Sequence, residues 1–333
     1  MYRHLGKSLL IYNPASQNGN GDKIAQVAIR TLRELHSFYP VIERTSQSGH
    51  GEEIASEAEA FDTVIALGGD GLVHEVVNGL MEIREELRPR FGLIPVGSGN
   101  DFANTLGISK DIHKALGQLF SGHDATVDIG RCNGEYFAES VSFGLDAAIA
   151  IETMERRKRT GGKGATLYLA SGMDQLRNHF HKYSYRLSVP EGIEIPPALR
   201  SPEEPKGTAD IADAASSKAN AIEGEMFLLA VQNGPTYGGG FNICPDASPT
   251  DGILNLCIAT SPLNQMKAIL IFLLAKGGHH TRFKQMEFLK TPSLHIEFDQ
   301  KVPAQIDGEI LEGESFDIEV LPRQLGVIAV KDV

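Results

Sequence analysis

The segment 61–80, FDTVIALGGDGLVHEVVNGL, constrains the fold of this chain more than any other. Residues 64–67 form a short apolar run that is typical of a buried strand, and apolar residues at helical spacing begin at about Leu72. Gly68, Gly69 and Gly71 lie between the two, and glycine allows a tight turn and a close approach to a ligand. The helix N-terminus beyond the turn presents free N–H groups to an anion. An ordinary tight turn would have the same glycines, so this segment alone does not distinguish a phosphate-binding turn from an ordinary one.

A second unit of the same kind follows along the chain. The expected strand 91–96 leads into the turn Gly97-Ser98-Gly99-Asn100-Asp101 and then into a helix that begins at Phe102. Adjacent parallel strands end at the same edge of a sheet, and open α/β sheets bind their ligands at that edge. Both glycine-rich turns are therefore expected there. The carboxylate of Asp70, inside a turn suited to phosphate, indicates Mg²⁺ or a proton transfer.

The order of the elements predicts two domains. In residues 1–122 strands alternate with helices, which is the pattern of an α/β domain with a doubly wound, parallel sheet. The strands are expected at 8–12, 39–44, 64–67 and 91–96, and the helices at 22–37, 51–60, from 72 onward and at 110–121. Residues 123–333 contain short alternating segments that predict a mainly antiparallel β-sandwich, whose last strand is free to return to the first domain.

The second domain is expected to contain three helices and one flexible insertion. Its strands are expected at 125–131, 135–141, 183–189, 226–233, 253–259, 293–298, 316–320 and 326–330, and its helices at 147–154, 165–179 and 262–276. Segment 191–221 is rich in Pro, Ser, Ala and acidic residues and has no apolar period, which predicts a mobile surface loop. The apolar stripe along 263–274 predicts a helix face directed at the core, and a wall for lipid chains is the alternative.

Composition and charge exclude several classes of protein. The formal net charge of −12 argues against broad nucleic-acid binding, so a polyanionic substrate would need local Lys or Arg, backbone N–H groups or a metal ion. Cys132, Cys244 and Cys257 have no metal-binding spacing and fit a reducing compartment. The first residues do not resemble a signal peptide, and the apolar run 268–275 is too short to cross a bilayer. We expect a cytoplasmic protein that reaches a membrane only peripherally.

Two charged clusters lie outside the glycine-rich turns. Asp307 and Glu309 would share one face of an extended segment, although a solvated acidic turn is the simpler interpretation because exposed acids are common. Residues 156–159, RRKR, with Lys163 nearby, form the strongest basic cluster. A solvated helix end explains this cluster most simply, and a patch that docks on anionic lipid head groups is the functional alternative.

Six blocks of residues, taken in order, resemble the diacylglycerol kinase catalytic-domain family, which also contains sphingosine kinases, ceramide kinases and bacterial lipid kinases. The blocks are NPASQNG at 13–19, Thr45 with Gly49-His50, GGDG at 68–71, GSGND at 97–101, the NG to DGIL segment at 233–254, and DGE at 307–309. The segment GGDGLVHEVVNGLM is similar to the sphingosine-kinase version, whereas GSGNDFANTLGI is similar to the bacterial diacylglycerol-kinase version. Together the blocks cover nearly the whole chain.

The resemblance implies an NAD kinase/diacylglycerol kinase-like first domain and an ATP-dependent lipid kinase. Such an enzyme transfers the γ-phosphoryl group of ATP, with Mg²⁺, to a lipid hydroxyl. Diacylglycerol, which would give phosphatidic acid in phospholipid biosynthesis, is the first choice of acceptor, and a sphingoid base or another lipid is the second. An NAD kinase-like enzyme and a catalytically inactive nucleotide- or lipid-binding module are the competing interpretations. The implied partner is a lipid at a membrane surface, and the resemblance does not decide whether the protein forms a homodimer.

The resemblance also assigns site residues. ATP is expected on Asn13, Pro14, Ala15, Ser16, Gln17, Thr45, Gly68, Gly69, Asp70, Gly71, Leu72, Val73, His74, Glu75, Gly97, Ser98, Asn100 and Asp101. Glu309 is implied as the general base that takes the hydroxyl proton, and Asp307 as acting with Asp70 and Asp101 through Mg²⁺ and water. A separate structural metal is implied at Asp251 with the carbonyls of Ser248 and Ile253, where a simple hairpin turn is the alternative.

Overall fold

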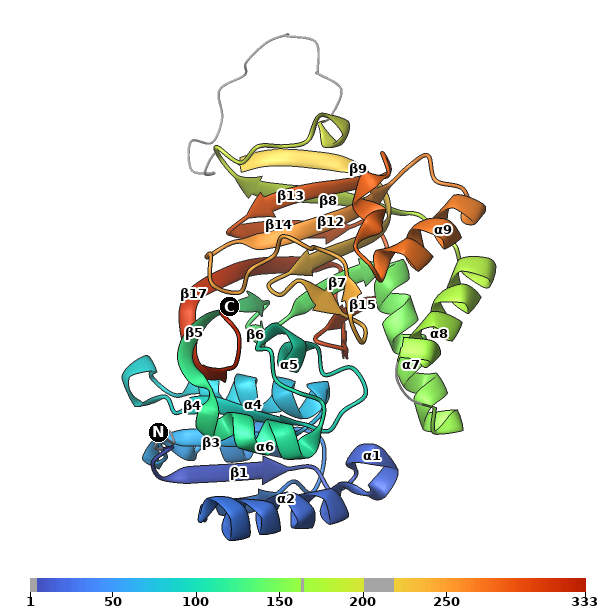
Figure 1. The fold of residues 1–333 in the computed structure, drawn as a ribbon. Coiled ribbons are helices and arrows are strands. Elements are labelled where there is room, and N and C mark those ends of the chain that lie inside the picture. Colours follow the sequence, from blue (N-terminus) through green and yellow to red (C-terminus); the bar gives the residue numbers. More distant parts are fainter. Residues whose placement is uncertain (1–4, 163–164, 201–218) are drawn as a thin grey trace.

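The computed structural model describes residues 5–162, 165–200 and 219–333. Figure 1 shows a lower part built from the first third of the chain, an upper part rich in strands, and three helices, α7 to α9, along one side. The middle of the expected insertion, residues 201–218, lies outside the described residues, as does Lys163 of the basic cluster.

The first part is an α/β domain around a parallel sheet, which confirms the predicted fold class. Its strands are β1 (Ser8–Tyr12), β2 (Val41–Arg44), β3 (Thr63–Gly68) and β4 (Arg90–Pro95). Its helices are α1 (Ser16–Gly19), α2 (Gly21–His36), α3 (His50–Ser56), α4 (Asp70–Glu82), α5 (Asp101–Thr105) and α6 (Ile112–Ser121). β1 pairs in parallel with both β2 and β3, and β3 with β4, so the turns after these strands meet at one edge.

Burial explains why these segments form a sheet with helices on both faces. The side chains of β3 are completely buried, as expected of a strand covered on two sides. α2 packs against α6 through His36, whose ring stacks on Phe120 at 4.4 Å between centroids, whereas α3 packs against α4. The chain passes from β1 to β2 in one direction along the sheet and from β2 through β3 to β4 in the other, so the usual right-handed crossovers put α2 on one face and α3 and α4 on the opposite face. α6 packs against α2 and so lies on the face of α2.

The second part is mainly antiparallel, which confirms the predicted β-sandwich. Its strands are β5 (His123–Cys132), β6 (Glu135–Phe137), β7 (Ser140–Gly144), β8 (Tyr183–Pro190), β9 (Ala219–Gln232), β10 (Thr236–Tyr237), β11 (Phe241–Asn242), β12 (Leu254–Thr260), β13 (Met286–Thr291), β14 (Ser293–Phe298), β15 (Ala304–Ile306), β16 (Glu309–Leu311) and β17 (Ser315–Ala329). Its helices are α7 (Leu145–Thr160), α8 (Ala165–Asn178) and α9 (Gln265–Ala275). Short 3₁₀ turns lie at Ala58–Ala60 and Glu85–Leu87 in the first part, and at Pro197–Leu199 and His279–Arg282 in the second.

Strand β17 joins the two parts. It pairs with β14 and β5 in the second part, and its residue Val327 pairs in parallel with Phe91 of β4 in the first. The sequence predicted two strands here, separated at 321–325. The structure has one strand instead, because this interval is an irregularity in the register between Leu321 and Leu325 and not a turn.

Three further expectations differ from the structure. The expected strand 135–141 is two strands, β6 and β7, because the amides of residues 138–140 turn toward a carboxylate instead of a neighbouring strand. Residues 219–221 of the expected loop belong to β9, where Ala219 pairs with Pro190 of β8. The stripe on α9 does not face the core as a whole, since Met266, the most exposed of its residues, is 81% exposed. Among the described helices, none is both long and apolar enough to span a bilayer.

Candidate active site

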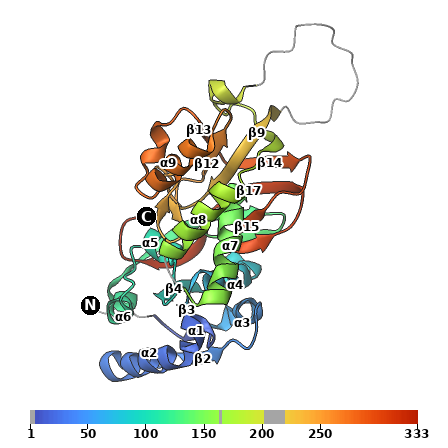
Figure 2. The same ribbon diagram turned by 90° about the vertical axis from the view of Figure 1, so that its right-hand side faces the viewer.

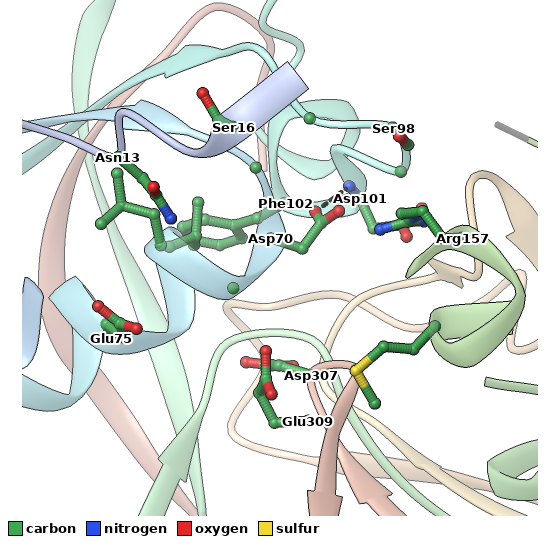
Figure 3. A pocket seen from close by; sticks show the side chains of 18 of the residues that line it. Asn13, Ser16, Asp70, Glu75, Ser98, Asp101, Phe102, Arg157, Asp307 and Glu309 are labelled. Carbon is green, nitrogen blue, oxygen red and sulfur yellow. Dashed lines mark hydrogen bonds between the residues drawn. The ribbon is translucent and has the colours of Figure 1, made fainter. Parts of the chain in front are cut away.

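A cleft of about 580 Å³ lies between the two parts, at the edge where β1, β3 and β4 end. It contains most of the predicted site residues, and Figure 3 shows side chains from both parts directed into it. The predicted nucleotide and catalytic residues that line the cleft are Asn13, Pro14, Ala15, Ser16, Gln17, Thr45, Gly69, Asp70, Gly71, Leu72, Val73, Glu75, Gly97, Ser98, Asp101, Asp307 and Glu309. Residues more than 290 positions apart in the sequence thus share one site.

The two glycine-rich turns pack directly against each other. A Cβ atom on Gly69 would lie 2.8 Å from the Cα of Gly97, and a Cβ on Gly97 would lie 2.5 Å from the Cα of Gly69. Both distances are shorter than real Cβ contacts, so neither turn tolerates a side chain at this point. These glycines are therefore explained by the contact between two turns, in addition to any approach of a ligand.

Asp70 and Asp101 connect three backbone segments around the cleft. The Asp70 carboxylate accepts hydrogen bonds from the backbone N–H groups of Asn100 and Asp101, both at 2.9 Å. The Asp101 carboxylate accepts from the N–H groups of Gly239 and Gly240 in the second part, both at 3.0 Å. The turn after β3 therefore orders the turn after β4, and that turn holds the glycine loop of the second part.

The charges of these two acids oppose each other. Burial, and then the neighbouring charge of Asp70, raise the pKa of Asp101 to about 7, against the pull of the two glycine amides and Lys110. A divalent cation beside both carboxylates would relieve this repulsion. Among the described residues no three His, Cys, Asp or Glu side chains are arranged to hold a metal, so a cation here would also need oxygens from a ligand or water. That donor set is typical of Mg²⁺ bound with phosphates.

The carboxylate of Asp307 is engaged by the backbone of the protein and is not free in the cleft. Its carboxylate accepts hydrogen bonds from the N–H groups of Ala138, Glu139 and Ser140, at 2.7–3.0 Å. Asp307 and Gly308 both have positive φ, 47° and 95°, and form the two-residue turn between β15 and β16. The expected extended DGE segment is therefore a hairpin turn, in which Asp307 anchors the loop that carries Glu309.

His74 fixes this hairpin to the first part. Its Nε2 lies 3.0 Å from Glu135 Oε1 and its Nδ1 lies 3.6 Å from Asp307 Oδ2. Burial alone would lower the pKa of His74, but the carboxylates of Asp307 and Glu135 raise it to about 10, so the imidazole is a cation at neutral pH. Asn78, one turn along α4, exchanges hydrogen bonds with the backbone of Tyr136 in β6. α4 is thus joined to the second part by a charged side chain and an amide.

Glu309 differs from the other acids because it is exposed on the short strand β16 and projects into the cleft (Figure 3). A Cβ on Gly71 would lie 3.1 Å from Glu309 Oε1, so this carboxylate lies over the first turn of α4. The absence of a side chain at Gly71 leaves it that space. Glu309 is therefore within reach of both the N-terminus of α4 and a molecule in the cleft.

Glu139 is a site residue that the sequence did not indicate. It lines the cleft and is 5% exposed. Burial, with the charges of Asp101, Asp307 and Asp70, raises its pKa well above the ordinary value of 4.5. No motif includes this position, and only the fold brings it beside three other acids.

The sequence also did not indicate the residues that form the helical side of the cleft. The contributing residues are Ala150, Thr153, Met154 and Arg157 of α7, Tyr168 of α8, and Tyr237, Gly238 and Gly239 of the glycine loop. Arg157 belongs to the predicted basic cluster, which the structure divides: Arg156 is paired with Glu152 at 2.9 Å, Arg157 faces the cleft, and Lys158 and Arg159 are exposed. Arg157 is exposed as well, and a patch for anionic lipid head groups at this cluster stays a prediction.

Three predicted nucleotide residues, Gly68, His74 and Asn100, do not line the cleft. Gly68 ends β3 beneath Leu72, where a Cβ would clash, and Asn100 closes its own turn by bonding the backbone of Gly97. Glu75 does line the cleft, and it also accepts hydrogen bonds from the amides of Gly49 and Gly51, both at 2.9 Å. It therefore orders the turn that begins α3.

The predicted structural metal at Ser248, Asp251 and Ile253 lies away from the cleft. Asp251 is exposed and its Oδ1 accepts a hydrogen bond from the amide of Ile253, which is the geometry of a side-chain-closed turn. The nearby Asp128 is buried and uses both oxygens to accept from the amides of Gly252 and Arg323, each at 2.7 Å. This geometry explains the loop without a metal, and the metal stays a prediction.

Comparisons with known proteins agree with this arrangement. Residues 7–132 match the diacylglycerol kinase catalytic domain, and residues 139–329 match the YegS C-terminal NAD kinase beta sandwich-like domain. The chain is 31% identical to a probable lipid kinase YegS-like of Chromohalobacter salexigens, covering 94% of this chain and 91% of that protein. It is 30% identical to a diacylglycerol kinase of Bacillus subtilis, covering 98% and 97%.

The fold is also found in a solved structure. A crystal structure of a putative diacylglycerol kinase from Bacillus anthracis superposes with a TM-score of 0.74 at 24% identity, covering 98% of this chain and 97% of that one. This likeness concerns the fold. With the family matches above, it follows that the chain belongs to the family of diacylglycerol kinase-like and YegS-like lipid kinases.

The charge on His74 gives a first prediction. Because its folded pKa of about 10 exceeds the ordinary 6.5, the stabilisation should be complete below pH 6.5 and be lost as the pH rises through 10. His74→Asn should lower the free energy of unfolding by about 1–3 kcal/mol at pH 6, and by much less above pH 10. Denaturant unfolding across this range measures the difference. His295→Asn, at a more exposed ion pair, is the control and should change stability by less than about 1 kcal/mol.

Glu139 gives a prediction of opposite sign. Because the pKa of Glu139 is raised in the folded protein, ionising this carboxyl costs more free energy in the folded chain than in the unfolded chain. The free energy of unfolding therefore falls as the pH rises above 4.5. Glu139→Gln should therefore be more stable than the wild type by about 1 kcal/mol or more at pH 8, and nearly equal in stability at pH 4. Thermal unfolding at both pH values measures this, with the exposed Glu312→Gln as control. An equal difference at both pH values would contradict the prediction.

Proposed function

We propose that this protein is an ATP-dependent lipid kinase that transfers the γ-phosphoryl group of ATP to the hydroxyl of diacylglycerol, giving phosphatidic acid. One observation supports it most: the exposed carboxylate of Glu309 faces the glycine-rich turn of the first part across a shared cleft. A phosphoryl donor and a hydroxyl acceptor must meet beside a base, and the cleft offers a separate wall for each. Membership of a lipid kinase family supports the same reaction class.

The first part offers the donor side. The turns 13–17, 69–71 and 97–99 expose backbone around the cleft, and α4 begins at Asp70 with its N–H groups directed toward the cleft. These groups, with the positive end of the helix dipole, suit the phosphates of ATP in an otherwise acidic protein. Arg157 reaches the cleft from α7 on the opposite side and adds a positive charge.

Asp70 and Asp101 would hold Mg²⁺ together with phosphate oxygens. The cation would neutralise negative charge on the phosphates during transfer. The two carboxylates are buried or half-buried, are fixed by backbone amides, and repel each other without a cation, which fits this use. Asp307 would act by holding the hairpin that carries Glu309, since its oxygens already accept three N–H groups.

Glu309 would act as the general base on the acceptor hydroxyl. An alcohol loses its proton only as the bond to phosphorus forms, so a nearby carboxylate assists in the transition state. Met154, Tyr168 and Tyr237 provide a largely apolar wall on the second-part side of the cleft, which suits the glycerol and upper acyl region of a lipid. A lipid in a membrane would be reached by peripheral attachment.

The reaction is tested with γ-labelled ATP, Mg²⁺ and diacylglycerol in mixed micelles. Label should enter the organic phase with the wild type, and Glu309→Gln should reduce kcat by about 10²- to 10⁴-fold because it removes the base. Ile310→Gln, on the adjacent exposed residue of β16, is the matched control and should retain activity. A wild-type rate in Glu309→Gln would exclude the assigned base, and no labelled lipid with any variant would exclude the proposed reaction.

A further inference from the structure

Helix α9 presents apolar side chains to solvent along one face. Met266, Leu270 and Leu273 are 81%, 49% and 48% exposed, and their spacing of four and three residues places them on one side of the helix. We call these three residues the α9 face. Scattered exposed apolar residues are ordinary, but a helical row of large ones in a soluble fold indicates a surface that binds something apolar.

The opposite side of α9 explains why the helix keeps this orientation. Ala268, Ile271 and Ala275 are buried, and Phe272 stacks on Phe241 with 5.3 Å between ring centroids. A Cβ on Gly172 of α8 would lie 2.2 Å from the Phe272 ring, so α8 leaves space for this side chain. The inner side of α9 is therefore tightly packed, and rotation of the helix to bury the α9 face would break these contacts.

The stretch of chain that carries the α9 face is rich in basic residues, unlike the chain as a whole. Residues 252–286 contain Lys267, Lys276, Arg282 and Lys284 but no Asp or Glu, in a protein whose formal net charge is −12. Lys276, Arg282 and Lys284 are exposed and lie just beyond the end of α9. At the other end, the Gln265 side chain donates to the carbonyls of Leu176 and Arg177, which brings exposed Arg177 beside the start of α9.

The α9 face is one helix away from the cleft. Phe272 of α9 contacts Tyr168 of α8, with 6.3 Å between ring centroids, and Tyr168 lines the cleft. Figures 1 and 2 show α7, α8 and α9 along the same side of the molecule. A surface that held α9 would therefore lie beside the helices that form one wall of the cleft.

We propose that the α9 face docks on a lipid bilayer that carries anionic head groups, with Met266, Leu270 and Leu273 inserted among the upper acyl chains and the flanking cations at the phosphates. An apolar helical row between cations is the arrangement by which interfacial helices bind anionic membranes. The role of this contact rests on the proposed function, since a lipid kinase must reach an acceptor in a membrane. The proposal adds which surface makes the contact.

The charge distribution favours a bilayer over a second copy of this chain. A symmetric dimer through the α9 face would place the same residues opposite each other, including the cations at both ends of the helix. Repulsion between these cations opposes such a dimer, whereas an anionic membrane attracts all of them.

The chain contains no tryptophan, so a single introduced Trp reports on one position. In Met266→Trp the emission should shift to shorter wavelength on vesicles of phosphatidylglycerol and phosphatidylcholine, and lipids brominated on their acyl chains should quench it. Leu35→Trp is the matched control, because Leu35 is 76% exposed but lies on α2 beside both Arg33 and Glu34. Its emission should change in neither test.

Each outcome decides the proposal. A shift with acyl-chain quenching at residue 266 and not at residue 35 supports it. No shift on vesicles overturns it. A shift that appears without vesicles as the protein concentration rises also overturns it, since it would show a contact between copies.

A second pair of variants separates docking from catalysis. Met266→Gln/Leu270→Gln/Leu273→Gln should lower the partition coefficient onto the same vesicles by about tenfold or more, because three apolar side chains lose their insertion. Leu35→Gln/Tyr39→Gln/Val41→Gln, at other exposed positions, should bind as the wild type does. Binding is measured without ATP, so it does not depend on the proposed reaction. With monomeric dihexanoylglycerol the α9 variant should keep wild-type kcat/KM. Unchanged vesicle binding by the α9 variant would overturn the docking surface, whatever its activity.

Discussion

The site depends on buried and half-buried carboxylates that accept hydrogen bonds from backbone N–H groups. Asp70 holds the turn after β4, Asp101 holds the glycine loop of the second part, and Asp307 holds the link between β6 and β7. Hydrogen bonds to a charged acceptor are among the stronger ones in proteins, and each of these fixes a turn or link at the border of a regular element. The acids therefore shape the cleft before any of them acts on a ligand.

This arrangement separates acids that position from the acid that is free to react. Asp307 uses its oxygens within the protein and is paired with His74, whereas Glu309, two residues later, is exposed to the cleft. The hairpin turn at Asp307 and Gly308 makes the separation possible, because it directs the two side chains into different surroundings. A rigid support beneath an exposed carboxylate is what a positioned general base requires.

The membrane proposal and the proposed reaction use different helices on the same side of the molecule. α7 and α8 give Met154, Arg157 and Tyr168 to the cleft, while α9 behind them presents its apolar face to solvent. Much of the chain is acidic, so a local basic and apolar surface would also set the orientation of the protein on an anionic bilayer. The two hypotheses fail independently, since one concerns phosphoryl transfer and the other concerns partition onto vesicles.

The sequence by itself determined the alternating order of the first domain, the β-rich second domain and the two glycine-rich turns, because these depend on local periodicity and on backbone freedom at glycine. It also indicated Asp70, Asp101, Asp307 and Glu309 through motifs. Only the tertiary structure decided that Asp307 is an anchor, that Glu139 lies among the acids, and that the α9 face is exposed. Those properties depend on which distant segments meet, and the pattern of one segment does not specify the surface that will cover it.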